Sequence, residues 1–106
     1  MSRYFQHEKL EVYKLSVSVT RRVLKLNFPK GFSALKDQAF RAVTSIPLNI
    51  AEGNGRNGAA RKNHFEIARG SAAEVCAILD CVELKGADEI QEDLRAIGAM
   101  LRTLAK

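Results

Sequence analysis

Apolar residues recur at steps of three and four along most of the chain, a spacing that places side chains on one face of an α-helix. The pattern predicts four helices, which run from His7 to about Phe28, from about Ala34 to Glu52, from Ala59 to Lys85 and from Asp88 or Glu89 to about Leu104. Short segments containing glycine, proline, asparagine or aspartate separate them. No stretch shows the period of two expected for a β-strand. Four helices joined by short turns predict an all-α fold, an antiparallel up-and-down four-helix bundle.

The first predicted helix carries two apolar stripes on nearly opposite sides. One stripe consists of Leu10, Tyr13, Val17 and Leu24, and the other of Val12, Leu15, Val19, Val23 and Leu26. A helix in a monomeric bundle needs only one such stripe. Two stripes indicate burial on both sides, against the chain's own core and against a neighbouring subunit. The alternative is a single wide stripe with a few exposed valines.

The second predicted helix has an apolar face and a polar face opposite to it. The polar residues recur at helical steps and are Gln38, Arg41, Ser45, Asn49, Glu52 and Arg56. A solvated surface is the alternative, but such a surface would more often carry Lys, Glu or Gln than Asn and Ser, which are weak helix formers. Pro47 removes the hydrogen bond to the carbonyl of Val43, so a kink held by packing or by a polar contact is expected.

The third predicted helix contains small residues beside its apolar seam, among them Gly70 and Ser71. A helix-interior glycine costs roughly 1 kcal/mol relative to alanine, and close approach of another helix would explain Gly70. Glu74 lies one turn further along and is expected to face the same neighbour. The polar residues of both helices are therefore predicted to form a network that fixes helix register and subunit geometry. Its members are Gln38, Arg41, Ser45, Asn49, Glu52, Ser71 and Glu74.

Length and composition fit one soluble domain over residues 1–106, since 46% of the residues are hydrophobic and no linker-like tract interrupts the chain. No apolar run approaches the roughly 18 residues of a membrane span, and the first residues lack the features of a secretory signal. We therefore expect a cytoplasmic protein. Cys76 and Cys81 fall inside a helical pattern and read as small buried hydrophobes, because they have no partners for a zinc site.

The chemistry-bearing residues give no signature of an enzyme. The sequence lacks a phosphate loop, a nucleophile elbow and an HExxH motif, and His7 and His64 have no partners at metal-ligand spacing. A catalytic acid–base cluster is one interpretation of the polar residues Asn49, Glu52, Ser71 and Glu74. A structural polar network is the favoured interpretation. No catalytic residue, metal or cofactor is predicted.

The net charge of +5 is distributed unevenly. The first 36 residues hold eight Lys or Arg against two acids, whereas residues 75–106 hold four against six. This permits nucleic-acid binding, contacts between subunits or an ordinary solvated surface. Candidate phosphate contacts are Arg21, Arg22, Lys25, Arg56, Arg61, Lys62 and Arg69. Without a recognition motif, we expect binding to RNA or DNA to occur through the backbone and to weaken with salt.

Four segments resemble a known family: Leu10–Tyr13, Phe28–Pro29, Leu35–Arg56 with its Ser-Ile-Pro-Leu-Asn-Ile-Ala-Glu-Gly core, and Phe65–Glu74. The chain is similar to the bacterial 23S rRNA intervening-sequence proteins, a four-helix-bundle family that includes accessory proteins of diversity-generating retroelements. It departs from them at Leu48, where a small or polar residue is usual, and in opening its third helix without a Ser or Thr cap.

The resemblance implies a ring-shaped homo-oligomer, a pentamer, with a basic surface and no catalytic activity. Some relatives bind nucleic acid and partner a reverse transcriptase. An alternative function is therefore a protein-interaction module that docks a reverse transcriptase or another partner without reading nucleic acid directly.

Overall fold

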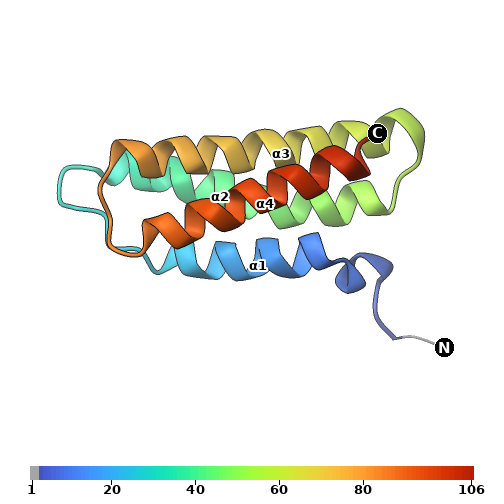
Figure 1. The fold of residues 1–106 in the computed structure, drawn as a ribbon, viewed down its shortest axis with the longest axis horizontal. Helices are drawn as coiled ribbons and strands as arrows, with labels where there is room; N and C mark the ends of the chain where they lie inside the picture. The colour runs from blue at the N-terminus through green and yellow to red at the C-terminus, as the bar shows by residue number, and fades with distance from the viewer. Residues whose placement is uncertain (1–2) are drawn as a thin grey trace.

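The computed structural model describes residues 3–106, so Met1 and Ser2 of the predicted domain lie outside the described residues. A short 3-10 helix, η1, precedes four α-helices, and no strand occurs in this part of the chain (Figure 1). The elements are η1 (Gln6–Lys9), α1 (Glu11–Leu24), α2 (Ser33–Asn54), α3 (Gly58–Cys81) and α4 (Ala87–Leu104). The predicted all-α four-helix fold is confirmed.

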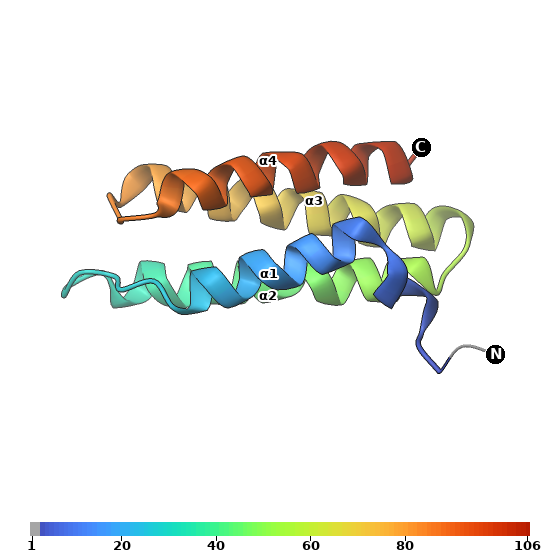
Figure 2. The ribbon, with the colours of Figure 1, turned by 60° about the horizontal axis from the view of Figure 1, so that its bottom comes forward.

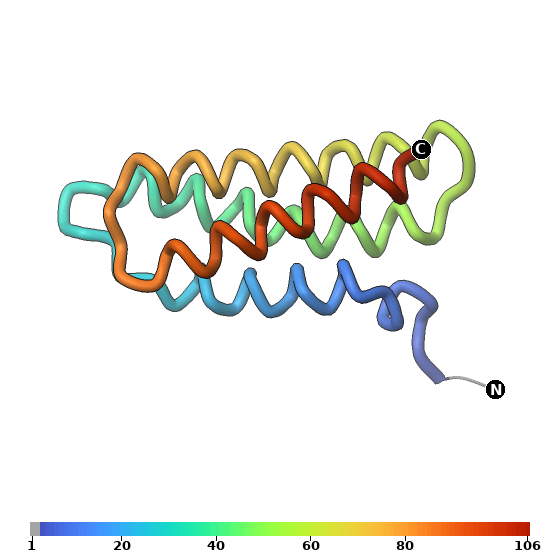
Figure 3. The backbone as a smooth tube through the Cα atoms, viewed as in Figure 1, coloured from blue at the N-terminus to red at the C-terminus, as the bar shows by residue number. Residues whose placement is uncertain are grey.

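Each helix runs antiparallel to the next, which brings the described ends of the chain to the same end of the bundle (Figure 3). The bundle is elongated, with principal extents of 47 × 27 × 21 Å. α2 packs against α1 and α3, and α4 packs against α3 and α1. Turned by 60°, the bundle shows α4 beside α3 and α1 in front of α2 (Figure 2). α1 and α3 therefore run in the same direction along the bundle.

The core lies where the four apolar faces meet, and its largest fully buried side chains include Phe65, Ile46 and Ile97. Of the two stripes on the first helix, the one containing Val12, Val19 and Val23 faces this core. The other stripe is only partly covered: Leu10 and Tyr13 are half-buried and pack against the core, Val17 is half-buried, and Leu24 is 42% exposed. One protomer therefore buries Val12, Val19 and Val23 of one stripe and covers the other stripe in part.

Two helices are shorter than predicted. The first begins at Glu11 because Leu10 is extended (φ −74°, ψ 130°), which separates α1 from η1, and it ends at Leu24 instead of Phe28. The third ends at Cys81 instead of Lys85, because Val82 is also extended (φ −126°, ψ 118°). β-Branched valine tolerates this backbone well. The other helix ends lie within two residues of those predicted.

Pro47 is buried inside α2, which continues as one helix on both sides of it. The missing proline N–H would otherwise bond the carbonyl of Val43. That carbonyl instead lies 3.2 Å from the hydroxyl of Thr20 on α1. The same hydroxyl lies 2.7 Å from the Ser16 carbonyl, so its proton is shared between the two acceptors. A contact from a neighbouring helix thus compensates for the proline.

The close approach between helices occurs at Gly53 and not, as predicted, at Gly70. A Cβ placed on Gly53 would lie 2.9 Å from the Cβ of His64 and 2.9 Å from the ring of Phe65. A Cβ on Gly70 would meet no described atom within 4 Å. The difference arises because Gly53 faces α3 in the core, whereas Gly70 is exposed on the side of α3 that borders α4.

Candidate nucleic-acid interface and interhelical polar network

A chain of neutral hydrogen bonds joins α2 to α3 along their outer side. The amide nitrogen of Asn49 donates to the Ser45 carbonyl at 2.9 Å and to the Ser45 hydroxyl at 3.0 Å. That hydroxyl also accepts a bond from the Ser71 hydroxyl at 3.0 Å. The Nδ1 of His64 lies 3.0 Å from the Asn49 Oδ1 and donates to it when Nδ1 carries the proton. All four side chains are half-buried, so the network links two helices beside the core.

A second link on this side joins Gln38 to Glu74, whose Nε2 and Oε2 atoms are 3.1 Å apart. Five of the seven residues predicted for the network therefore connect α2 with α3. The other two lie apart from it: Arg41 is exposed, and Glu52 forms an ion pair with Arg56 at 2.9 Å.

Sequence reasoning missed His64 as a member of the network. The signal was its spacing, because His64 precedes Ser71 by seven residues and therefore lies on the same face two turns earlier. The network can hold the register of two helices, since each interhelical bond contributes about 0.5–1.5 kcal/mol only when both partners are in place.

The seven predicted phosphate contacts do not form one patch. Arg21, Arg22 and Lys25 lie at or just beyond the end of α1, whereas Arg56, Arg61 and Lys62 lie at the opposite end of the bundle, around the connection from α2 to α3 (Figure 1). Arg69 lies further along α3.

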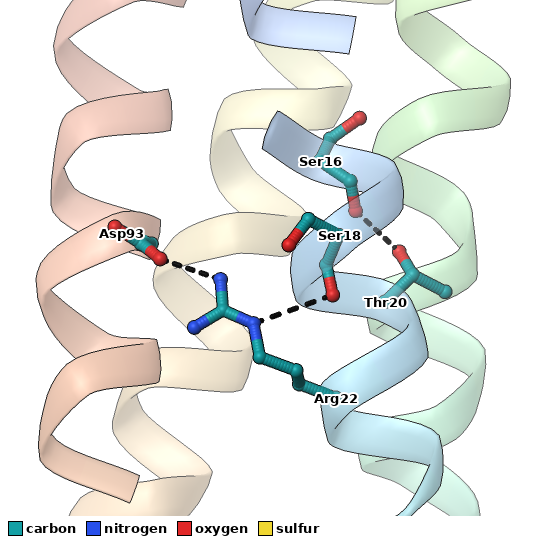
Figure 4. A network of polar contacts seen from close by, with 5 residues as sticks. All are labelled: Ser16, Ser18, Thr20, Arg22 and Asp93. Carbon is teal, nitrogen blue, oxygen red and sulfur yellow. Dashed lines mark hydrogen bonds and ion pairs between the residues drawn. The ribbon is translucent and has the colours of Figure 1, made fainter. Parts of the chain in front are cut away.

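Three of these arginines are engaged within the chain. The guanidinium of Arg22 pairs with Asp93 of α4, and each of the two side chains is 36% exposed (Figure 4). The Nε of Arg22 also lies 3.4 Å from the Ser18 carbonyl. Arg69 pairs with Glu66 at 3.4 Å, and Arg56 with Glu52. Arg22 therefore ties α1 to α4, which makes it a poorer phosphate ligand than the sequence predicts.

Three basic side chains border a hollow of about 330 Å³ at the start of α3. The residues that line it are Gly58, Ala59, Arg61, Lys62, Leu104, Ala105 and Lys106, so none of the described lining residues carries a carboxylate side chain. Sequence reasoning did not select Lys106, which reaches this end because α4 runs antiparallel to α3. Arg61 is held over the Phe65 ring, 4.6 Å from its centroid.

The hollow also lies at a helix N-terminus. Asn57 occupies the capping position of α3, and among the described residues its side chain makes no capping bond. The first backbone N–H groups of a helix lack partners within the helix and carry partial positive charge. The three basic side chains and these N–H groups together suit an anion such as a phosphate.

Other sites have little support in the described part of the chain. It contains no group of three or more His, Cys, Asp or Glu side chains arranged to hold a metal ion. Cys76 and Cys81 are free thiols, and Cys81 is exposed, which differs from the buried position predicted for it. Within residues 3–106, no helix has both the length and the apolar character needed to cross a membrane.

These features define a small all-helical protein whose antiparallel helices are joined by an outer polar network. The family model described as 23S rRNA-intervening sequence protein matches residues 8–103, a span that covers α1, α2, α3 and all but the last residue of α4. The chain belongs to this family, and the predicted resemblance is confirmed. Comparison with curated proteins gives no match.

Proposed function

We propose that the protein is a non-enzymatic, homo-oligomeric, cytoplasmic protein that binds the phosphate backbone of RNA or DNA at the start of α3. The observation that carries the proposal is the hollow lined by Arg61, Lys62 and Lys106 without an Asp or Glu side chain. Its position at an uncapped helix N-terminus adds backbone donors to the three cations.

Binding at this hollow is directed to phosphates and not to bases. The stacked Arg61 is already oriented, so less side-chain entropy is lost when it meets a phosphate. No element within residues 3–106 matches the known base-reading motifs, which favours weak sequence preference.

A homo-oligomer would strengthen this binding. Each copy repeats the same hollow, so a ring of copies, a pentamer as the family resemblance implies, presents several such sites to one strand. Simultaneous contacts raise the effective concentration at every further site. Two isolated bundles would lack that gain, which makes assembly part of the proposed function.

A charge-reversal experiment tests the location of the site. Lys62→Glu in the hollow is compared with Lys25→Glu, a matched control just beyond α1 at the opposite end of the bundle. Both positions are exposed, and both substitutions change the net charge by the same amount. Binding of a short fluorescent single-stranded RNA, and of DNA of the same sequence, is measured by anisotropy across a salt series.

We expect Lys62→Glu to weaken binding and to reduce the slope of log K against log salt by about one, since one phosphate contact is lost. The control should retain most of the affinity. Equal losses in the two variants would show that only net charge matters and would overturn the assignment to this hollow.

Docking of a protein partner, such as a reverse transcriptase, is the second candidate function. It is favoured by the exposed side chains of Phe5 and Leu48, which are 75% and 68% exposed and line a hollow of about 580 Å³. Leu48→Glu should abolish capture of such a partner while leaving RNA binding intact. Unchanged capture by this variant would exclude the surface.

A further inference from the structure

Three aromatic side chains lie in a row near the start of the described chain. The rings of Phe5 and His7 are stacked, with centroids 5.9 Å apart and an angle of 12° between the ring planes. The His7 ring also meets the ring of Tyr13 on α1, at 4.7 Å and 71°, in an edge-to-face contact. Both distances lie in the range over which aromatic rings attract one another. The row therefore anchors Phe5 to α1.

The backbone of Phe5 is held in place although its side chain is exposed. Its N–H donates to the Glu8 carboxylate at 2.7 Å, and the Glu8 N–H donates to the Phe5 carbonyl at 3.1 Å. Phe5 is nevertheless 75% exposed, so stacking on His7 leaves most of its ring open to solvent. An aromatic ring that is fixed in position and open to water suits a ligand that has a flat face of its own.

Phe5 lies at the end of the bundle that carries the basic hollow at the start of α3 (Figure 1 and Figure 2). It lines a hollow of about 580 Å³, whose lining extends to Gly55 just beyond α2. The lining of the basic hollow begins at Gly58, and the three residues from Gly55 to Gly58 span no more than about 11 Å. Phosphates in one helical strand are about 3.4 Å apart along its axis. A strand of several nucleotides therefore reaches from one hollow to the other.

The charges around Phe5 are nearly balanced. Glu52 also lines the hollow at Phe5, but it pairs with Arg56 at 2.9 Å. Residues 3–9, the segment that carries Phe5, hold two Lys or Arg against Glu8. Charge at this position therefore neither attracts nor repels a phosphate strongly, and affinity here has to come from the ring.

We propose that Phe5 is a stacking platform for an unpaired base of a single-stranded RNA or DNA whose phosphates occupy the hollow at the start of α3. The inference rests on the proposed phosphate binding and narrows its ligand to a single strand. In a duplex the bases are already paired and stacked on one another, so an unpaired base is the one that is free to lie on Phe5. A basic surface combined with an exposed aromatic side chain is the arrangement by which proteins bind single strands with little sequence preference.

The platform differs from a surface that docks a protein. Leu48 lines the same hollow and is 68% exposed, but it has no π face on which a base can stack. A bound strand therefore depends on Phe5 and not on Leu48, whereas a docked protein would bury both apolar side chains. Phe5→Leu separates the two ligands, because it keeps apolar surface at position 5 and removes the ring.

Binding by Phe5→Leu tests the platform. Phe32→Leu is the matched control, since Phe32 is also an exposed phenylalanine and lies at the opposite end of the bundle, before α2. Binding of a short fluorescent single-stranded RNA, and of DNA of the same sequence, is measured by anisotropy, and folding by circular dichroism. We expect Phe5→Leu to be folded and to bind both strands about fivefold to fiftyfold more weakly, the order of effect of losing one stacked base. The control should bind like the parent.

A fluorescent reporter gives an independent check. The chain contains no tryptophan, so Phe5→Trp places a single indole at the platform. Stacking of a base on the indole should quench its emission while the affinity for RNA is retained. Inorganic polyphosphate supplies phosphates without bases, so it should bind at the hollow and leave the emission unchanged. Phe32→Trp, the matched control, should respond to neither ligand.

Parental affinity of Phe5→Leu for single strands, or Phe5→Trp emission that RNA does not quench, would overturn the platform. Lys62→Glu and Lys25→Glu are titrated in parallel with the same strands. If Lys62→Glu alone weakens binding, the phosphate site stands and only the platform fails. If Phe5→Leu weakens binding while the two charge reversals act equally, the platform stands and only the hollow fails. A parent that binds neither strand overturns both.

Discussion

Thr20 and Pro47 make a coupled pair whose energetic link can be measured. The carbonyl of Val43 has lost its helical donor to Pro47 and instead faces the Thr20 hydroxyl at 3.2 Å. Thr20→Val keeps the shape of the side chain but removes the donor. Because Thr20 is buried, water cannot readily replace it. The other acceptor of the hydroxyl, the Ser16 carbonyl, keeps its own helical N–H donor.

Thr20→Val should lower the free energy of unfolding by about 1–3 kcal/mol, because it leaves the buried Val43 carbonyl without a hydrogen-bond partner. For a domain of this size, such a loss lowers the Tm by about 4–8 °C per kcal/mol. Pro47→Ala restores an N–H at position 47, which can bond the Val43 carbonyl. In that background Thr20→Val should cost about 1 kcal/mol less than in the parent.

Urea denaturation of the parent, the two single variants and the double variant gives this coupling free energy directly. Strict additivity of the two substitutions would refute the reasoning, because it would mean that Thr20 does not substitute for the missing proline donor. The test requires all four proteins to unfold in one cooperative transition.

Three further substitutions probe separate contacts, and thermal denaturation measures each. Gly53→Ala should destabilise the fold by about 1–3 kcal/mol, because its Cβ would press against the buried Phe65 ring; an unchanged Tm would contradict this close approach. Arg22→Met should cost no more than about 1 kcal/mol, since its pair with Asp93 is a third exposed; a much larger loss would show deeper burial. Gln91→Leu should cost about 1 kcal/mol and loosen α3 from α4, so retained stability would mean that its two bonds contribute nothing.

The helices themselves could be predicted because each needs only a periodic apolar face, and the spacing of apolar residues in the local sequence determines that face. The stripe of α1 that contains Val12, Val19 and Val23 was identified in this way, and these three valines lie in the core. Helix ends were predicted less well. Leu10 and Val82 leave helical geometry although each is compatible with a helix, so the local pattern does not mark these ends.

Which partner a side chain meets depends on tertiary packing, and here the sequence was less informative. Gly70 lies inside a predicted helix and Gly53 just after the predicted end of another, yet only Gly53 meets a neighbouring helix within the protomer. Arg22 reads as a free surface cation, but it lies opposite Asp93, which is 71 residues away. The polar network was largely anticipated, because its members recur at helical steps, whereas His64 was recognised only from its contact with Asn49.

One binding measurement decides whether the hollow at the start of α3 binds nucleic acid. The parent protein is titrated with single-stranded RNA at low and at physiological salt, and the dissociation constants are compared. Phosphate contacts by Arg61, Lys62 and Lys106 predict measurable binding at low salt that weakens steeply as salt rises. Absence of binding at low salt, or an affinity that does not change with salt, would contradict the proposal.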